Sequence, residues 1–200
     1  MNSGNYSAGA VKHAFWFMEF RKVVSLRSEG RTWEEIRKLS EEENIFGSPT
    51  PARAKQIFHT VSARVKGLDD SFYPLFQEGD LATQKLFALV AIMASDELFA
   101  VFFYEVIREK MIIGINEYSP SDIRLFFKNK QEQSEKAAKW TDQTLERLGQ
   151  SYRNFLMEAG VTDSGRETRK ILKPLLVPEM ESWLEEQHMA YYLKALKGER

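Results

Sequence analysis

Apolar residues recur at helical spacing along most of this chain, whereas the strict alternation typical of β-strands is nearly absent. Together with residues that favour helix ends, this spacing predicts helices over residues 14–28, 32–44, 51–66 (starting at Pro51 or Ala52), 141–159 and 179–196. The run Thr-Trp-Glu-Glu35 has the form of a capping box at the start of the second of these helices. The protein is therefore expected to be mainly α.

Further helices are predicted in the middle of the chain. Asp80 is expected to cap one central helix and Ser95 the next, which runs to about Lys110 before Gly114 ends it. Residues 69–79, which precede them, are expected to form a loop. A shorter helix should begin at Ser-Pro-Ser-Asp122 and end in the polar run 128–134.

The apolar run 86–104 could also be read as a membrane span. That interpretation would place Asp96 and Glu97 near the centre of the bilayer, at a cost of roughly 2.5 kcal/mol or more for each carboxylate. Two buried helices that meet at a capped break explain the same residues without this cost. The run is therefore interpreted as core, and no membrane partner is expected.

Residues 162–178 differ from the helical segments around them. They contain a polar turn with Gly165, a basic stretch, and Pro174 and Pro178 on either side of Leu-Leu-Val177. Because proline disrupts a helix interior, this segment predicts a short β-hairpin or an extended arm that follows a helix.

The expected architecture is a compact helical bundle, with a helix-turn-helix-like N-terminal part and a small winged-helix element near the C-terminus. Residues 1–68 are assigned to an N-terminal helical lobe and residues 69–200 to a central and C-terminal helical lobe. One continuous domain is the alternative, because 200 residues lie at the upper end of one domain and the lower end of two.

Composition narrows the function classes. With 43% hydrophobic and 28% charged residues the chain resembles ordinary globular proteins, and its net charge of -1 provides no global attraction to nucleic acid. The lack of cysteine excludes disulfides and thiolate chemistry. Since the first residues show no secretion signal, a cytoplasmic location is expected.

Candidate catalytic chemistry is also sparse. His13, His59 and His188 are scattered without metal-ligand spacing, and the glycine pair Gly4 and Gly9 follows no strand and precedes no Lys-Ser/Thr. Acids occur mainly as sequence neighbours, whose side chains diverge on a helix. The chain is expected not to be an enzyme, with no catalytic residue, cofactor, metal or small-molecule substrate.

The predicted helix 51–66 is the first candidate interface, because residues 48–67 contain basic residues and no acid. Helical spacing places its polar residues on two adjoining stripes, Lys55, His59, Ser62 and Lys66 on one and Arg53, Gln56, Thr60 and Arg64 on the other. Arginine and glutamine suit phosphates and base edges. Together with residues 29–39, the segment is similar to a helix-turn-helix reader, although the 40–50 connection is long for one. The alternative is a solvated basic helix face.

The second candidate interface begins with the predicted helix 141–159, whose polar stripe contains Gln143, Arg147, Gln150 and Asn154. The hairpin segment behind it provides Arg166, Arg169, Lys170 and Lys173. A helix followed by a basic hairpin is the layout of a winged helix, in which the wing binds phosphate and the helix reads the groove. A plain packed helix with a surface arm is the alternative.

The order of several sequence segments resembles the BrxA family, small accessory proteins of bacteriophage-exclusion (BREX) defence systems. The matching segments are Tyr6-Ser-Ala-Gly-Ala10, Glu19-Phe-Arg-Lys-Val-Val24, Arg64-Val-Lys-Gly-Leu68, the apolar helices from Leu86 to Lys110, Lys139-Trp-Thr141 and Leu156-Met-Glu-Ala-Gly160. The resemblance implies a non-enzymatic helical DNA-binding protein, with a fold like that of a helical antitermination factor. It also implies other BREX components as partners.

The sequence thus predicts a double-stranded DNA-binding accessory protein of phage defence, with the helix 51–66 as a principal contact and weak sequence preference. A protein-interaction adaptor within the defence complex is the rival hypothesis. An RNA-binding protein is a further alternative, because a basic helix face cannot distinguish duplex types.

Overall fold

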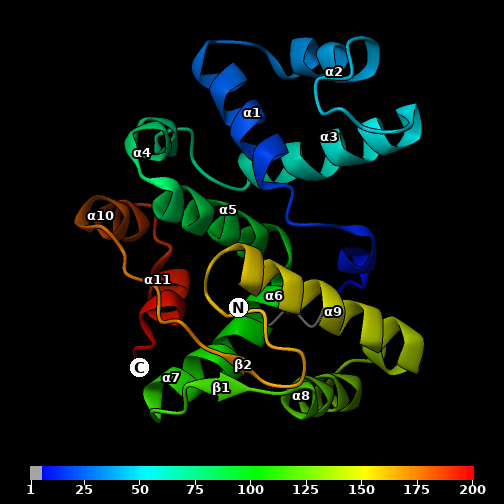
Figure 1. The fold of residues 1–200 in the computed structure, drawn as a ribbon, viewed down its shortest axis with the longest axis vertical. Helices are drawn as coiled ribbons and strands as arrows, with labels where there is room; N and C mark the ends of the chain where they lie inside the picture. The colour runs from blue at the N-terminus through cyan, green and yellow to red at the C-terminus, as the bar shows by residue number, and fades with distance from the viewer. Residues whose placement is uncertain (1–5) are drawn as a thin grey trace. The chain divides into compact units, whose positions relative to one another are not determined.

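The computed structural model describes residues 6–200, and it confirms a mainly α protein (Figure 1). The described residues form two compact units. One is Trp16–Ser95, and the other combines residues 6–15 with residues 96–200. The sequence predicted a boundary between two lobes after residue 68, and that boundary stays a prediction.

The unit Trp16–Ser95 consists of helices joined by short connections. They are α1 (Phe17–Ser28), α2 (Trp33–Glu42), α3 (Pro51–Lys66), α4 (Phe72–Glu78) and α5 (Leu81–Ser95). The capping box of α2 is present, since Glu35 N–H donates to Thr32 Oγ1 at 3.2 Å and Thr32 N–H donates to Glu35 Oε2 at 2.7 Å. α1 begins later than residue 14, because Trp16 has a left-handed backbone with φ 52°.

The expectation of a loop over residues 69–79 is wrong, because α4 forms there. Its apolar side completes an aromatic cluster: the Phe72 ring lies 5.7 Å from Phe87, and the Phe76 ring lies 5.6 Å from Phe20. Pro74 is tolerated because it lies in the first turn of the helix, where its missing N–H has no intrahelical acceptor. The burial of these rings therefore stabilises a helix in a segment where the sequence predicted a loop.

The second unit opens with a helical stretch made of α6 (Glu97–Phe102), the π-helical turn η2 (Phe103–Arg108) and α7 (Glu109–Ile112). The expected cap at Ser95 is wrong by one residue. Asp96 is the N-cap and accepts a hydrogen bond from Phe99 N–H at 3.0 Å. The Ser95 hydroxyl instead donates to Ala91 O at 2.9 Å, within the last turn of α5.

Within residues 6–200 no single helix is long and apolar enough to cross a membrane. Among the described residues, one pair, α5 and the helical stretch that follows it, meets the length and composition required, and only when the two are taken together across a break. Asp96 lies at that break.

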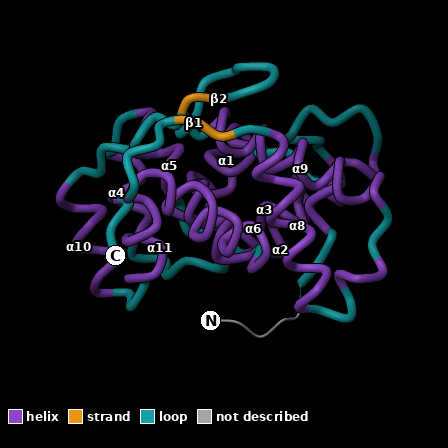
Figure 2. Tube along the Cα trace, turned by 90° about the horizontal axis from the view of Figure 1, so that it is seen from below, coloured by secondary structure: helices purple, strands orange, loops and turns teal. Residues whose placement is uncertain are grey.

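A small antiparallel sheet lies in the second unit (Figure 2). β1 (Glu117–Tyr118) pairs with β2 (Arg169–Lys170), and Thr162 forms a bridge with Ile171. Leu172 N–H also donates to Val161 O at 2.7 Å. The hairpin predicted near residues 162–178 is therefore present over residues 161–172, and β1, which the sequence did not predict, extends it on the other side.

The helices next to this sheet are α8 (Pro120–Gln133) and α9 (Asp142–Glu158), joined by a connection that contains η3 (Ala137–Lys139). Buried aromatic side chains hold both helices on α6. The Phe102 ring lies 5.2 Å from Phe126 of α8 and 5.3 Å from Tyr152 of α9. The N-terminal 3₁₀ turn η1 (Gly9–Lys12) also packs against α9.

The final helix is broken, which corrects the prediction of one helix over residues 179–196. It consists of α10 (Pro178–Glu186) and α11 (Ala190–Lys197). His188 between them has a left-handed backbone with φ 57°, which an α-helix cannot contain. The break lets both halves bury apolar residues, namely Met180, Trp183 and Leu184 on α10 and Tyr192, Leu193 and Leu196 on α11.

Candidate nucleic-acid interface

The first candidate interface is α3, whose beginning is well defined. Thr50 is its N-cap and accepts from Arg53 N–H at 3.2 Å. The connection from α2 is held by Asn44, whose side chain donates to Ser48 O at 2.9 Å and accepts from Ser48 N–H at 2.8 Å. α2 and α3 pack against each other, but this long connection differs from the short turn of a helix-turn-helix.

The two predicted stripes of α3 have different environments. Lys55, His59 and Lys66 are exposed, whereas Ser62 of the same stripe is buried. On the adjoining stripe Thr60 is buried, Arg64 is only 3% exposed, and Arg53 and Gln56 are half-buried. The Arg53 guanidinium donates to Gln56 Oε1 at 2.8 Å.

Three basic residues of α3, but not Lys55, lie over tryptophan rings of the same unit. The guanidinium carbons of Arg53 and Arg64 lie 4.9 Å and 5.7 Å from the centre of the Trp16 ring. Lys66 Nζ lies 4.6 Å from the centre of the Trp33 ring. These cations stabilise the packing of α3 through cation–π contacts, so the exposed charge on this helix is smaller than its sequence suggests.

The second candidate interface is α9 with the hairpin that follows it. Gln143, Arg147 and Gln150 are exposed on α9, and Gln150 donates to Asn154 Oδ1 at 3.0 Å. Arg166, Lys170 and Lys173 are exposed on the hairpin. Arg169 is only 7% exposed and donates to Gly165 O at 3.1 Å and to Arg153 O.

The loop of the hairpin, which we call the wing (residues 163–170), is tied to α9 by hydrogen bonds. Arg153 on α9 donates to Gly165 O at 3.0 Å and Arg166 O at 2.5 Å. Asp163 Oδ1 accepts from Gly165 N–H at 3.1 Å and Lys170 N–H at 3.0 Å. The structure thus gives the predicted basic residues two roles: Arg169 fastens the wing, while Arg166 and Lys170 project from it.

The order of elements around α9 is that of a winged helix. Along the chain, the helical stretch that ends with α7 is followed by β1, α8, α9, the segment 161–163 and β2. In the sheet, β2 pairs with β1 on one side and with the segment 161–163 on the other. In such an arrangement the second of two packed helices is the reader, and the wing contacts the nucleic acid backbone. Arg147, Arg166, Lys170 and Lys173 make no ion pair with any described residue.

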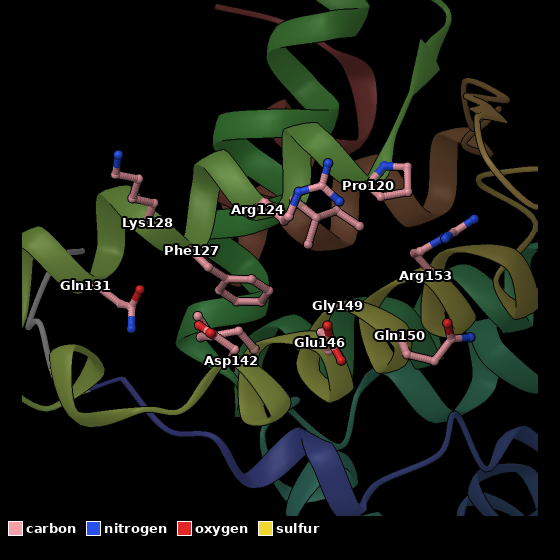
Figure 3. A pocket seen from close by; sticks show the side chains of 12 residues that line it. Pro120, Arg124, Phe127, Lys128, Gln131, Asp142, Glu146, Gly149, Gln150 and Arg153 are labelled. Atoms are coloured by element: carbon pink, nitrogen blue, oxygen red, sulfur yellow. The ribbon is translucent and has the colours of Figure 1, made fainter.

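A groove of about 710 Å³ lies between α8 and α9 (Figure 3). We call it the α8–α9 groove. Its apolar lining is Ile123, Phe127 and Leu145, and Gly149 of α9 lies close against α8, since a Cβ there would be 3.0 Å from Ile123 Cγ2. Charged and polar residues line its edges: Arg124, Lys128, Gln131, Asp142, Glu146, Gln150 and Arg153.

Sequence reasoning missed Arg124 and Arg153 as functional candidates. Arg124 lies on α8, which was predicted without an assigned face, and its exposure follows only from the packing of α8 on α6 and α9. Arg153 could have been noticed, because it follows Gln150 by three positions on the same helix, close to the polar stripe. In the part of the chain that the structure describes, no three His, Asp or Glu side chains gather as metal ligands would.

Substitution of Gly165 by alanine should disrupt the wing. A Cβ at this position would lie 2.0 Å from the backbone oxygen of Thr168, so the loop has to change its path. We expect increased backbone exchange in residues 163–170 by hydrogen–deuterium exchange, with α9 unchanged. Ser164→Ala is the matched control, because Ser164 is exposed and next to Gly165. Equal protection in both variants would contradict this account of the wing.

Comparisons with known proteins agree over nearly the whole chain. A family model described as BrxA matches residues 4–188. The chain is 37% identical over 194 residues to a protein named "BREX protein BrxA" from Bacillus cereus (strain H3081.97), covering 97% of each. It is 26% identical over 165 residues to a protein of the same name from Escherichia coli O9:H4 (strain HS), covering 78% of this chain and 73% of that one.

The fold has a counterpart among solved structures. The crystal structure of an uncharacterized protein from Magnetospirillum magneticum matches with a TM-score of 0.81 and 16% identity, over 96% of this chain and 98% of that one. At this identity the match concerns the fold alone.

Proposed function

Because this chain belongs to the BrxA family of BREX proteins, we propose that it is a non-enzymatic component of phage defence that binds double-stranded DNA. The observation that carries the proposal is the winged-helix order of elements around α9, with exposed cations on both α9 and the wing. In this proposal α9 enters the major groove, and the wing contacts phosphates alongside it.

Of the two candidate interfaces, we propose the α9 and wing surface as the principal one. Its exposed cations are Arg147 on α9, Arg166 and Lys170 on the wing, and Lys173, which follows the wing. On α3, by contrast, Arg64 is buried and Lys66 lies over Trp33. The neighbouring helix α2 carries several glutamates, which would repel phosphate close to α3. Arg37 of α2 pairs with Glu34 at 2.6 Å and with Glu41 at 3.0 Å, and further glutamates are exposed. Lys55, His59 and Lys66 are therefore proposed as a secondary contact.

Affinity in this proposal comes mainly from phosphate contacts, with weak sequence preference. Gln143 and Gln150 could donate to base edges, but acidic Asp142 and Glu146 lie close to them on α9. The cations on the wing neutralise phosphate charge without reading sequence. We propose that other BREX components are its protein partners. We also propose that it is located in the cytoplasm.

Fluorescence anisotropy with labelled duplex DNA, single-stranded DNA and RNA of matched sequence tests the proposal. We expect the duplex to bind best, and the logarithm of its affinity to fall linearly with the logarithm of salt concentration, by about 0.9 for each phosphate contact. Equal or better binding of RNA would favour an RNA-binding protein. No binding of any nucleic acid at low salt would sink the DNA proposal and leave the adaptor hypothesis.

A further inference from the structure

The α8–α9 groove presents apolar surface that no described segment covers. Of the apolar residues that line it, Ile123 and Phe127 are buried, and the Phe127 ring lies 5.8 Å from Tyr152 of α9, whereas Leu145 is half-buried. Figure 3 shows the opening between the helices, with Arg124 on the α8 side and Asp142 and Glu146 on the α9 side. An open apolar groove with charged edges is typical of a site that accepts a peptide segment.

The same unit exposes an apolar segment that fits such a groove. Residues 172–177, which we call the arm, connect β2 to α10. Leu172 is 47% exposed, Leu175 is 90% exposed and Val177 is 36% exposed, so the arm presents several exposed apolar side chains close together. Pro174 lies within the arm and Pro178 directly after it, so the arm is held extended and loses little conformational entropy on binding.

The two edges of the groove carry opposite charges, as do the arm and the residue that follows it, although Arg153 also lies on the α9 edge. Lys173 precedes Leu175 on the arm, and Glu179 follows it on the first turn of α10. The groove has Glu146 on one edge and Arg124 on the other. An arm whose leucine enters the groove can therefore place its lysine beside the acidic edge and its glutamate beside the basic edge.

We propose that the arm of one copy of this chain docks in the α8–α9 groove of a second copy. The contact is heterologous, because the surface that inserts differs from the surface that receives it. Each copy retains a free arm or a free groove, so association continues beyond a dimer as concentration rises. This inference does not depend on DNA binding, since it is tested without nucleic acid; only Lys173 belongs to both proposed contacts.

Sedimentation velocity of the full chain tests the proposal, with concentration raised to the high micromolar range because a contact of this size is weak. We expect the average sedimentation coefficient to increase continuously with concentration. Leu175→Asp should abolish the increase by removing the inserting side chain, and Glu146→Lys should weaken association at least about tenfold by repelling Lys173. Leu125→Asp is the matched control, since Leu125 is 61% exposed on α8 and does not line the groove.

Mixing the variants distinguishes this contact from other modes of association. Leu175→Asp retains a functional groove and Glu146→Lys retains a functional arm, so their mixture should form a 1:1 complex that grows no further. A mixture of Lys173→Glu with Glu146→Lys should instead restore continued association, because each arm then meets a groove of opposite charge. All variants should keep the wild-type circular dichroism spectrum, since the replaced side chains are exposed.

A wild-type chain that stays monomeric over the whole concentration range would overturn the proposal. Association that Leu175→Asp leaves intact would exclude the arm. Association that Leu175→Asp abolishes, but that neither mixture restores, would show that arms contact each other or another surface, and would exclude the groove.

Discussion

Replacement of Arg147, Arg166, Lys170 and Lys173 together by alanine should reduce affinity for duplex DNA by more than about a hundredfold at low salt, because essentially all non-specific binding energy comes from phosphate neutralisation. The slope of log affinity against log salt should also become less steep by about 0.9 for each phosphate that is no longer neutralised. All these side chains are exposed, so the free energy of unfolding should change by less than about 0.5 kcal/mol for each. Anisotropy titrations over a salt series measure both the affinity and the slope.

A variant with the same change in charge is the control. Lys22, Lys38, Lys194 and Arg200 are exposed and lie away from α9 and the wing in sequence, and their replacement by alanine should leave the salt slope unchanged. The double variant Lys55→Ala and Lys66→Ala tests α3 as a secondary contact. If this double variant loses more affinity than the α9 and wing variant, α3 is the principal contact rather than a secondary one.

Phe102→Ala should destabilise the unit that contains α8 and α9 by about 3–5 kcal/mol, because apolar burial is removed and a cavity is left behind. The Phe102 side chain is fully buried, and its ring contacts Phe99, Phe126 and Tyr152. Such a loss is a large part of the roughly 5–15 kcal/mol that stabilises a typical domain. Urea denaturation followed by tryptophan fluorescence measures it.

The effect of Phe102→Ala on binding provides a second measurement. Phe102 contacts both α8 and α9, so its removal should loosen the pair and weaken DNA binding even under conditions where the protein stays folded. Leu125→Ala is the control, because this exposed residue of α8 makes little packing contact, and it should change stability by less than about 0.5 kcal/mol. A destabilisation below about 1 kcal/mol in Phe102→Ala would contradict the proposed core.

Much of the fold was predictable because local chemistry decides helix ends. Thr32 and Asp80 cap their helices as the sequence predicts, Thr141 caps the helix that was expected to begin there, and Gly114 and Gly160 adopt positive φ after helix ends. In each case side-chain hydrogen bonds or backbone freedom act within a few residues. The helix at 72–78 was missed because its stability comes from rings on α1 and α5, which no local pattern reveals.

The candidate interface was predictable only in part. The sequence showed that the 166–173 segment is basic and that Pro174 follows it, and a hairpin is found at this position. It could not show that β2 pairs with β1, since the two strand residues of β1 carry no strand pattern and their partner lies about fifty positions away. The sequence also could not show that Arg169 holds the wing in place by a hydrogen bond to Gly165 O, whereas Arg166 is exposed to solvent.

The sequence by itself determined the mainly α class, the position of most helices, the absence of cysteine chemistry and the stretches where basic residues gather, because each depends on composition or on neighbours within a turn or two. Only the tertiary structure decided which cations are exposed. Arg53 and Arg64 share a helix with Lys55, but both lie over Trp16, a residue from a distant part of the chain, whereas Lys55 faces solvent. Burial depends on what packs against a helix from elsewhere, and helical periodicity specifies only which side chains share a face.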